Sequence, residues 1–256
     1  MKIHKIHFVF DKNKKSQSLK KHISKTYKNY NARRASFIVI AGGDGFMLKN
    51  IKKLYKFKKP FYGINCGTFG FLMNKYSYMD INKKISIAKK ITINPLTIKT
   101  IYKKSRIKKL IAINELSLFR QSRQTVKLKL KINNKTIIKR LIGDGLLVST
   151  PAGSTAYNLS VNGPILSLNS GKLAVTPISP FRPRRWRGKI ISDKSIIKIY
   201  NQNSQKRPVA AVADNIEIRN VDKIIVKIQN KISIHLMYDR DRTLIKRIKN
   251  EQLRKK

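Results

Sequence analysis

The sequence Ser36-Phe37-Ile38-Val39-Ile40-Ala41-Gly42-Gly43-Asp44-Gly45 contains a short apolar run that ends abruptly in glycines. An apolar run of this length, bounded by a turn signal, predicts a buried strand. A helical spacing follows the glycines, in Phe46, Ile51, Leu54 and Tyr55, so a helix should begin at the turn. The backbone N–H groups of such a turn can face an anion at the helix N-terminus, while Asp44 projects from the strand end.

Strand and helix patterns alternate on both sides of this turn. Strands are predicted at Ile3–Phe10 and at Phe61–Cys66, which follows Pro60, and a basic helix is predicted at Ser16–Tyr30. This βαβ alternation is typical of a parallel sheet. We therefore expect an α/β, Rossmann-like domain over residues 1–95.

From about Leu96 the pattern becomes that of β-structure. Apolar residues alternate with lysines over Val126–Ile132, Asn133-Asn134 marks a turn, and Thr136–Ile142 resumes the strand, which together predict a hairpin. Further strand-like runs follow at Ser195–Tyr200, Val209–Ile218, Lys223–Ile228 and Ile232–Tyr238. We expect a mainly-β domain over 96–242, a C-terminal helix over 243–256 that packs back on the first domain, and an α+β fold overall.

The composition is strongly basic, with 58 Lys and Arg against 12 Asp and Glu and a formal net charge of +46. Such an excess attracts polyanions, including nucleic acids. The charge is spread along the whole chain, however, and lysine is enriched together with isoleucine and asparagine, as compositional drift would produce. We expect nonspecific polyanion binding and no specific nucleic-acid partner, because aromatic RNA-binding signatures and a Cys/His zinc pattern are missing.

Cysteine and apolar patterning indicate the compartment. The lone Cys66 excludes an internal disulfide framework and fits a reducing environment. The first ten residues lack a signal-peptide core, and no stretch approaches the roughly 18 apolar residues of a membrane span. We expect a cytoplasmic chain without a membrane partner. None of the four histidines lies beside a glycine turn or a carboxylate cluster, which argues against histidine chemistry and a histidine metal site.

Three of the 12 carboxylates lie in apolar settings, namely Asp44, Glu115 and Asp144. A carboxylate inside an apolar strand usually has a task or a partner, because its desolvation is costly. The alternatives are that Asp44 caps the helix and that each of the others pairs with one of the many lysines. Asn114 beside Glu115 adds a neutral donor and acceptor, a pair suited to ribose hydroxyls.

The segment Ser149–Ser160 packs small hydroxylated residues, Pro151 and Tyr157 directly after a predicted strand. Small side chains let a ligand approach the backbone, and Tyr157 could stack on a base. A polar loop that leads into a helix has the same composition, so both readings stay open. Neither a GxxxxGK[ST] loop nor a GxGxxG fingerprint occurs in the chain.

Taken together and in order, these motifs resemble the NAD kinase family. The resemblance rests on Gly42–Gly45, Gly67–Leu72, Asn114-Glu115, Asp144–Tyr157, Asn162–Ile165 and Thr176–Pro180, and it covers roughly residues 36 to 220. The glycine turn alone is shared with lipid kinases and phosphofructokinases, whereas the TPAGSTAY block together with Asn-Glu is specific.

The resemblance implies an active site between an α/β and a β-rich domain, with ATP as phosphoryl donor and NAD as acceptor. It implies that Asp44 receives or orients the 2′-hydroxyl proton of the adenosine ribose, which makes it the catalytic residue. The residues that it implies for nucleotide binding are Gly45, Asn114, Glu115, Asp144, Ala152, Thr155, Ala156, Tyr157, Asn158, Leu159 and Ser160. It also implies a divalent metal, Mg²⁺, with the donor, and a homodimer or homotetramer.

Two features of the resemblance stay open. Some relatives carry a glutamine two residues after the Asp that corresponds to Asp214, but Ile216 stands there in this chain. Within the Gly67–Leu72 stretch, Phe69 and Phe71 could exclude water from the substrate or could belong to the core.

Overall fold

The computed structural model describes residues 4–68, 70–76, 80–102, 106–240 and 246. Within these residues the chain forms two compact units. The first contains the chain up to Ile93 and resumes at Ser233, and the second runs from Asn94 to Ile232. Among the helices so described, none is both long and apolar enough to cross a membrane.

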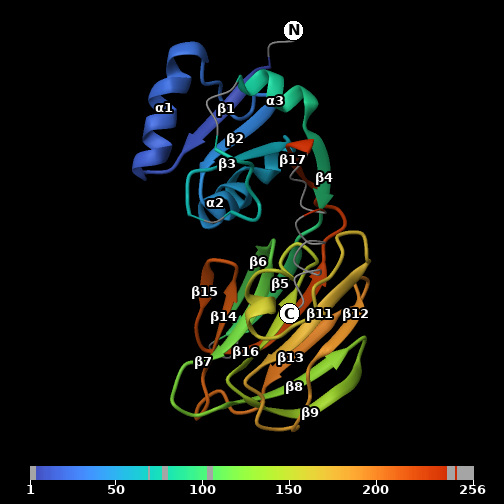
Figure 1. Cartoon of the computed structure of the whole chain (residues 1–256). Helices are drawn as coiled ribbons and strands as arrows, with labels where there is room; N and C mark the ends of the chain where they lie inside the picture. Colours follow the sequence, from blue (N-terminus) through green and yellow to red (C-terminus); the bar gives the residue numbers. More distant parts are fainter. Residues whose placement is uncertain (1–3, 69, 77–79, 103–105, 241–245, 247–256) are drawn as a thin grey trace. The chain divides into compact units, whose positions relative to one another are not determined.

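The first unit is built on a five-stranded sheet in the order β1-β2-β3-β17-β4 (Figure 1). Its strands are β1 (Ile6–Phe10), β2 (Phe37–Gly42), β3 (Phe61–Asn65), β17 (Ile234–Tyr238) and β4 (Lys89–Ile93). The first four run parallel, and β4 runs antiparallel to β17. This arrangement confirms the parallel sheet that the βαβ pattern predicts.

Helices cover both faces of this sheet because its strands are apolar on both sides. The helices are α1 (Lys14–Thr26), α2 (Asp44–Leu54), followed by a short 3-10 helix, η1 (Tyr55–Phe57), and α3 (Ile81–Ile87). Alternate residues of β2 point to opposite faces. Val39 and Ala41 pack in one apolar cluster with α1 and α3. Residues such as Ile38 face the other side, where α2 supplies Met47 and Ile51 to the core.

The position of β17 corrects the domain boundary predicted from the sequence. We expected Ile232–Tyr238 to belong to the β-rich domain, but β17 pairs with β3, with Leu236 opposite Phe61. The physical reason is burial on both faces, since Leu236 and Tyr238 are at most 1% exposed, as in an interior parallel strand. The predicted helix over 243–256 lies outside the described residues except for Lys246.

The second unit is a sandwich of two six-stranded antiparallel sheets. One has the order β12-β11-β10-β7-β14-β15, and the other the order β6-β5-β16-β13-β8-β9 (Figure 1). The strands of the first sheet are β7 (Glu115–Arg120), β10 (Gly145–Ser149), β11 (Lys172–Ile178), β12 (Lys189–Ser192), β14 (Val209–Ala213) and β15 (Ile216–Ile218). Those of the second are β5 (Leu96–Tyr102), β6 (Arg106–Ala112), β8 (Val126–Ile132), β9 (Lys135–Gly143), β13 (Ile197–Asn201) and β16 (Val221–Ile228). A single apolar core fills the space between them.

Turn chemistry explains two details of the sandwich. The predicted β8–β9 hairpin is confirmed, and Asn133 and Asn134 both have positive φ, as its tight turn requires. The expected single run Val209–Ile218 is instead two strands, β14 and β15. They are separated by a turn in which Asp214 has a φ of 50°. Asp is one of the few non-glycine residues that adopt this backbone region readily.

Asn74 ties β3 to β17 and gives a test of the first unit. Its side chain is fully buried, donates to the Met237 carbonyl at 2.9 Å, and accepts from the Asp239 N–H at 2.9 Å. We expect Asn74→Ala to lower the free energy of unfolding by about 2–4 kcal/mol, because two buried backbone groups lose their partners. Ser86→Ala, at an exposed site, is the control and should change it by less than about 0.5 kcal/mol. Equal denaturation midpoints for the two variants would contradict this role.

Candidate active site

The glycine turn lies at the carboxyl edge of the parallel sheet, where ligands bind in open α/β sheets. A Cβ atom on Gly42 would lie 2.6 Å from the ring of Phe46, so only glycine lets α2 begin so close to the strand. The residue that caps α2 is Gly43, and Asp44 is the first helical residue. The alternative that Asp44 serves as the N-cap is therefore wrong.

The Asp44 carboxylate instead accepts hydrogen bonds from two backbone N–H groups of the Gly67–Leu72 stretch. Phe71 N donates to its Oδ2 at 2.5 Å, and Leu72 N donates to its Oδ1 at 3.0 Å. Leu72 is 3% exposed and anchors the stretch in the core, whereas Phe71 is half-buried. Phe69 lies outside the described residues.

In the second unit, Asp214 organises the turn that carries Asn114 and Glu115. Its carboxylate accepts hydrogen bonds from three consecutive N–H groups, those of Ile113 at 2.9 Å, Asn114 at 2.8 Å and Glu115 at 3.3 Å. The Asp214 N–H in turn donates to the Glu115 carbonyl at 3.1 Å. A carboxylate that accepts several backbone N–H groups is a rigid local support, because charge-assisted bonds are the stronger ones.

Asn114 presents an unsatisfied acceptor at this turn. Its Oδ1 atom is buried and has no hydrogen-bond partner among the described residues. A buried polar atom without a partner is costly unless a ligand or water supplies one. The Glu115 side chain beside it is also buried, at 9% exposure. This is the environment that a ligand-binding role for the Asn114-Glu115 pair requires.

The Ser149–Ser160 segment packs directly on the Asn114 turn. Thr150 Oγ1 donates to the Ile113 carbonyl at 2.7 Å and accepts from the Gly153 N–H at 3.1 Å. A Cβ atom on Gly153 would lie 2.2 Å from the Asn114 carbonyl oxygen. Glycine is therefore required at position 153, because it lets two motifs that are distant in the sequence touch through their backbones.

Tyr157 lies over the outer face of the first sandwich sheet. It begins the short helix α4 (Tyr157–Ser160), and its ring centroid is 5.7 Å from that of Phe119 on β7. Partial burial, and then the charges of Asp144 and Glu115, raise the pKa of the Tyr157 phenol above its usual value. The phenol therefore stays neutral and able to donate near pH 7. Three of the predicted site residues, Tyr157, Asp144 and Glu115, thus lie in one region of this unit.

The Asn158 side chain is bound within the protein. We expected Asn158 to contact the nucleotide, and because its side chain is fully buried with its polar atoms in use, such a contact would come from its backbone. Its Oδ1 accepts from Thr176 at 2.7 Å, and its Nδ2 donates to the Pro164 carbonyl at 2.9 Å and to the Ser154 carbonyl at 3.3 Å. The side chain fixes the loop to β11 instead of facing a ligand. Of its predicted neighbours, Ala152 is buried, Thr155, Ala156 and Leu159 are half-buried, and Ser160 is exposed.

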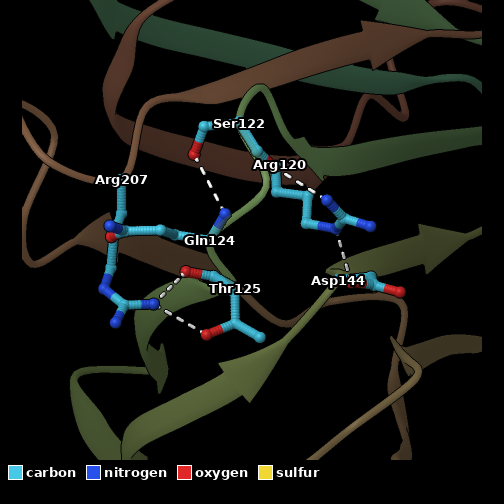
Figure 2. Close-up of polar contacts among 6 residues, drawn as sticks. All are labelled: Arg120, Ser122, Gln124, Thr125, Asp144 and Arg207. Atoms are coloured by element: carbon cyan, nitrogen blue, oxygen red, sulfur yellow. Dashed lines mark hydrogen bonds and ion pairs between the residues drawn. The ribbon is translucent and has the colours of Figure 1, made fainter.

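Asp144 is held by a residue that the sequence analysis missed. Figure 2 shows the Arg120 guanidinium against the Asp144 carboxylate, with Nε 2.6 Å from Oδ1. The backbones are joined as well, since Arg120 N donates to the Asp144 carbonyl at 3.0 Å. Both side chains are about 40% exposed, so the pair orients Asp144 more than it stabilises the fold. The role of Asp214 was also missed. Its position as a carboxylate within the apolar Val209–Ile218 run was a signal in the sequence, like that of the other three carboxylates in apolar settings.

Comparison with known proteins places these motifs in one family. Residues 113–236 match the model of the ATP-NAD kinase C-terminal domain. The NAD kinase of Zymomonas mobilis is 41% identical, with 99% of each chain covered. The NAD kinase of Rickettsia bellii is also 41% identical, with 98% of this chain and 99% of the relative covered.

Solved structures show the same fold. A yeast NADH kinase in complex with NADH has a TM-score of 0.75 at 25% identity and covers 91% of this chain and 75% of its own. An NAD kinase from Archaeoglobus fulgidus in complex with ATP has a TM-score of 0.74 at 20% identity and covers 93% of this chain and 94% of its own. Because relatives about 40% identical match almost the entire length, the chain belongs to the NAD kinase family.

Proposed function

We propose that Asp44 receives the proton when this chain transfers the γ-phosphoryl group of ATP to the 2′-hydroxyl of the adenosine ribose of NAD. The hydroxyl oxygen attacks the γ-phosphorus, its proton passes to the Asp44 carboxylate, and the bond to the β-phosphate oxygen breaks to release ADP. Phosphoryl transfer needs positioning and charge neutralisation more than covalent help, so one aimed carboxylate suffices. The two N–H groups that Phe71 and Leu72 donate support this role, because they fix the carboxylate.

The residues around Asn114 are proposed to bind NAD. The observation that carries this assignment is the buried Oδ1 of Asn114, which lacks a protein partner among the residues described. A ribose hydroxyl would satisfy it, with the carboxylate of Glu115 as a neighbouring acceptor. Asp144 would contact a nucleoside, and Gly45 would let the nucleotide lie close to the glycine turn. The 152–160 segment would contact adenine and ribose through Thr155, Ala156, Tyr157, Leu159 and Ser160, with Ala152 and Asn158 as their support.

A divalent metal is proposed to enter with the phosphates of ATP. The described residues contain no group of three or more His, Cys, Asp or Glu side chains placed to hold a metal ion by themselves. Asp44 is an oxygen donor of the kind that Mg²⁺ prefers, but it would be a single protein ligand. When bound, Mg²⁺ neutralises phosphate charge.

We also propose that the chain forms a homodimer or homotetramer. A cytoplasmic location is proposed as well, and the free, buried thiol of Cys66 fits such a reducing compartment.

A direct assay separates this function from that of a lipid kinase with the same glycine turn. Purified chain is incubated with ATP, Mg²⁺ and either NAD or diacylglycerol. We expect NADP to form and the lipid to stay unmodified. Lipid phosphorylation without NADP formation would contradict the proposal.

Replacement of Asp44 tests the proton acceptor. We expect Asp44→Asn to lower kcat by roughly 10²–10⁴-fold, because the amide cannot take the proton. The variant should stay folded, with a melting temperature lowered by the loss of one backbone hydrogen bond. The matched control is Asp80→Asn, since Asp80 also accepts a backbone N–H, that of Lys83 at the start of α3, but lies outside the proposed site. It should keep normal turnover. Near-normal turnover in Asp44→Asn would assign the residue to support of the 67–72 stretch alone.

Tyr157 tests the proposed adenine contact. Tyr157→Ala should raise KM for NAD about tenfold, because the ring is lost, with little change in melting temperature. Tyr157→Phe keeps the ring beside Phe119 and should restore most of the affinity. Because the raised phenol pKa keeps Tyr157 neutral, wild-type affinity should not change through its titration between pH 6 and 9. Unchanged NAD affinity in Tyr157→Ala would remove the residue from the site.

Asp214 is proposed as a positioning residue for the Asn114-Glu115 turn. In Asp214→Asn an amide nitrogen faces backbone N–H donors, so we expect the free energy of unfolding to fall by about 1–3 kcal/mol. KM for NAD should rise about tenfold at nearly constant kcat. Asp193→Asn, at a turn of the same unit, is the control and should alter neither value. Loss of stability with an unchanged KM for NAD would show that Asp214 acts only on the fold.

A further inference from the structure

The connection between β11 and β12, residues 179–188, concentrates arginine. The chain has 16 arginines among its 58 basic residues, so lysine supplies most of its charge. Four of the 16 lie within six consecutive positions, at Arg182, Arg184, Arg185 and Arg187, which we call the arginine loop. Drift toward lysine explains the background charge but does not explain a run of arginines.

The four guanidinium groups are available to an anion. All four residues are exposed, and among the described residues none of them forms an ion pair with a carboxylate. Arg182 lies over the ring of Phe181, which is itself 57% exposed, with 4.7 Å between the guanidinium carbon and the ring centroid. Like charges held this close together repel one another, so a bound polyanion would relieve the repulsion.

The arginine loop is fixed beside Asp144. Phe181 N donates to the Ile142 carbonyl at 2.7 Å, Ile142 N donates to the Arg182 carbonyl at 2.8 Å, and Asp144 N donates to the Ile178 carbonyl at 2.9 Å. A Cβ atom on Gly143 would lie 2.9 Å from the Ser179 carbonyl oxygen, so glycine at 143 permits this contact. Trp186 packs against the sandwich core and holds the far part of the loop.

We propose that the arginine loop binds the phosphate groups of a nucleotide substrate, either the triphosphate of ATP or the diphosphate of NAD. The inference rests on the proposed function, because Asp144 next to the loop is assigned there to a nucleoside. Arginine suits this task better than lysine, since its planar fork binds phosphate oxygens in pairs. The loop would capture the anionic nucleotide and lower its KM, without a part in the chemical step.

A second basic surface provides a matched control. A pocket in the first unit is lined by Lys5, Lys28, Arg33 and Arg34, together with three uncharged residues. It lies where β1 and β2 begin, at the edge of the parallel sheet opposite to Asp44. It therefore has the same charge as the arginine loop but no connection to the candidate site residues of that unit.

The test compares two quadruple variants that each remove four positive charges. One carries Arg182→Gln, Arg184→Gln, Arg185→Gln and Arg187→Gln, and the other carries Lys5→Gln, Lys28→Gln, Arg33→Gln and Arg34→Gln. KM for ATP and for NAD and kcat are measured at low and physiological salt, with melting temperature and subunit number for each variant. We expect the arginine-loop variant to raise KM about tenfold for the nucleotide whose phosphates it binds. Its kcat should stay within twofold, the salt dependence of KM should be weaker, and the control should stay near wild type.

A second measurement does not depend on turnover. Inorganic tripolyphosphate should raise the melting temperature of the wild type and of the control, but not that of the arginine-loop variant. A wild type that fails to phosphorylate NAD but keeps this protection would overturn the proposed function and leave the phosphate site standing. Unchanged KM for both nucleotides would overturn the arginine-loop proposal. An equal rise in KM in the control variant would also overturn the arginine-loop proposal. So would a rise in KM that is accompanied by a change in subunit number.

Discussion

The Asp214 carboxylate accepts hydrogen bonds from three consecutive backbone N–H groups, and the candidate site of the second unit is built on that arrangement. In a chain with 58 basic residues, a lysine partner would be the simplest way to satisfy a carboxylate. Asp214 and Asp44 each accept hydrogen bonds from backbone N–H groups. Backbone donors are fixed in direction, whereas a lysine side chain must lose rotamer freedom to hold one geometry. Both carboxylates therefore support precise loop shapes.

Glycine sets the second constraint, because close approach of backbones is what joins the motifs. Gly153 lies against Asn114, and Gly143 lies against the start of the arginine loop. Any side chain at these two positions would overlap a carbonyl group and push the segments apart. The Asn114 turn, the Tyr157 segment and the Asp144 strand end thus form one assembly on the outer face of a rigid sandwich. Rigid sheets are a suitable base for such a site, because they hold loops within a narrow range of positions.

Charge has two meanings in this molecule. The lysine excess is distributed over both units and follows composition, so it carries little information about a partner. The Arg120–Asp144 pair and the arginine loop differ, because particular guanidinium groups are placed at one end of the candidate site. Phosphates are therefore assigned to the arginine loop and not to the basic pocket of the first unit. The reason is that the arginines of the loop are fixed beside a candidate site residue, whereas the lysine excess is distributed over the molecule.

The sequence by itself determined the parallel sheet, the β8–β9 hairpin, the glycine turn before α2 and the motifs that identify the family, because each depends on residues close together in the chain. Only the tertiary structure assigned β17 to the first sheet, since an apolar strand does not encode which sheet will bury both its faces. Only the tertiary structure showed that the Asn158 side chain faces the interior. Its hydrogen-bond partners Thr176 and Pro164 lie outside its own motif, so the motif alone did not predict them. Arg120 and the role of Asp214 were missed for the same reason. The groups that they hold come from other strands, and pairing across a sheet is decided by folding, not by spacing.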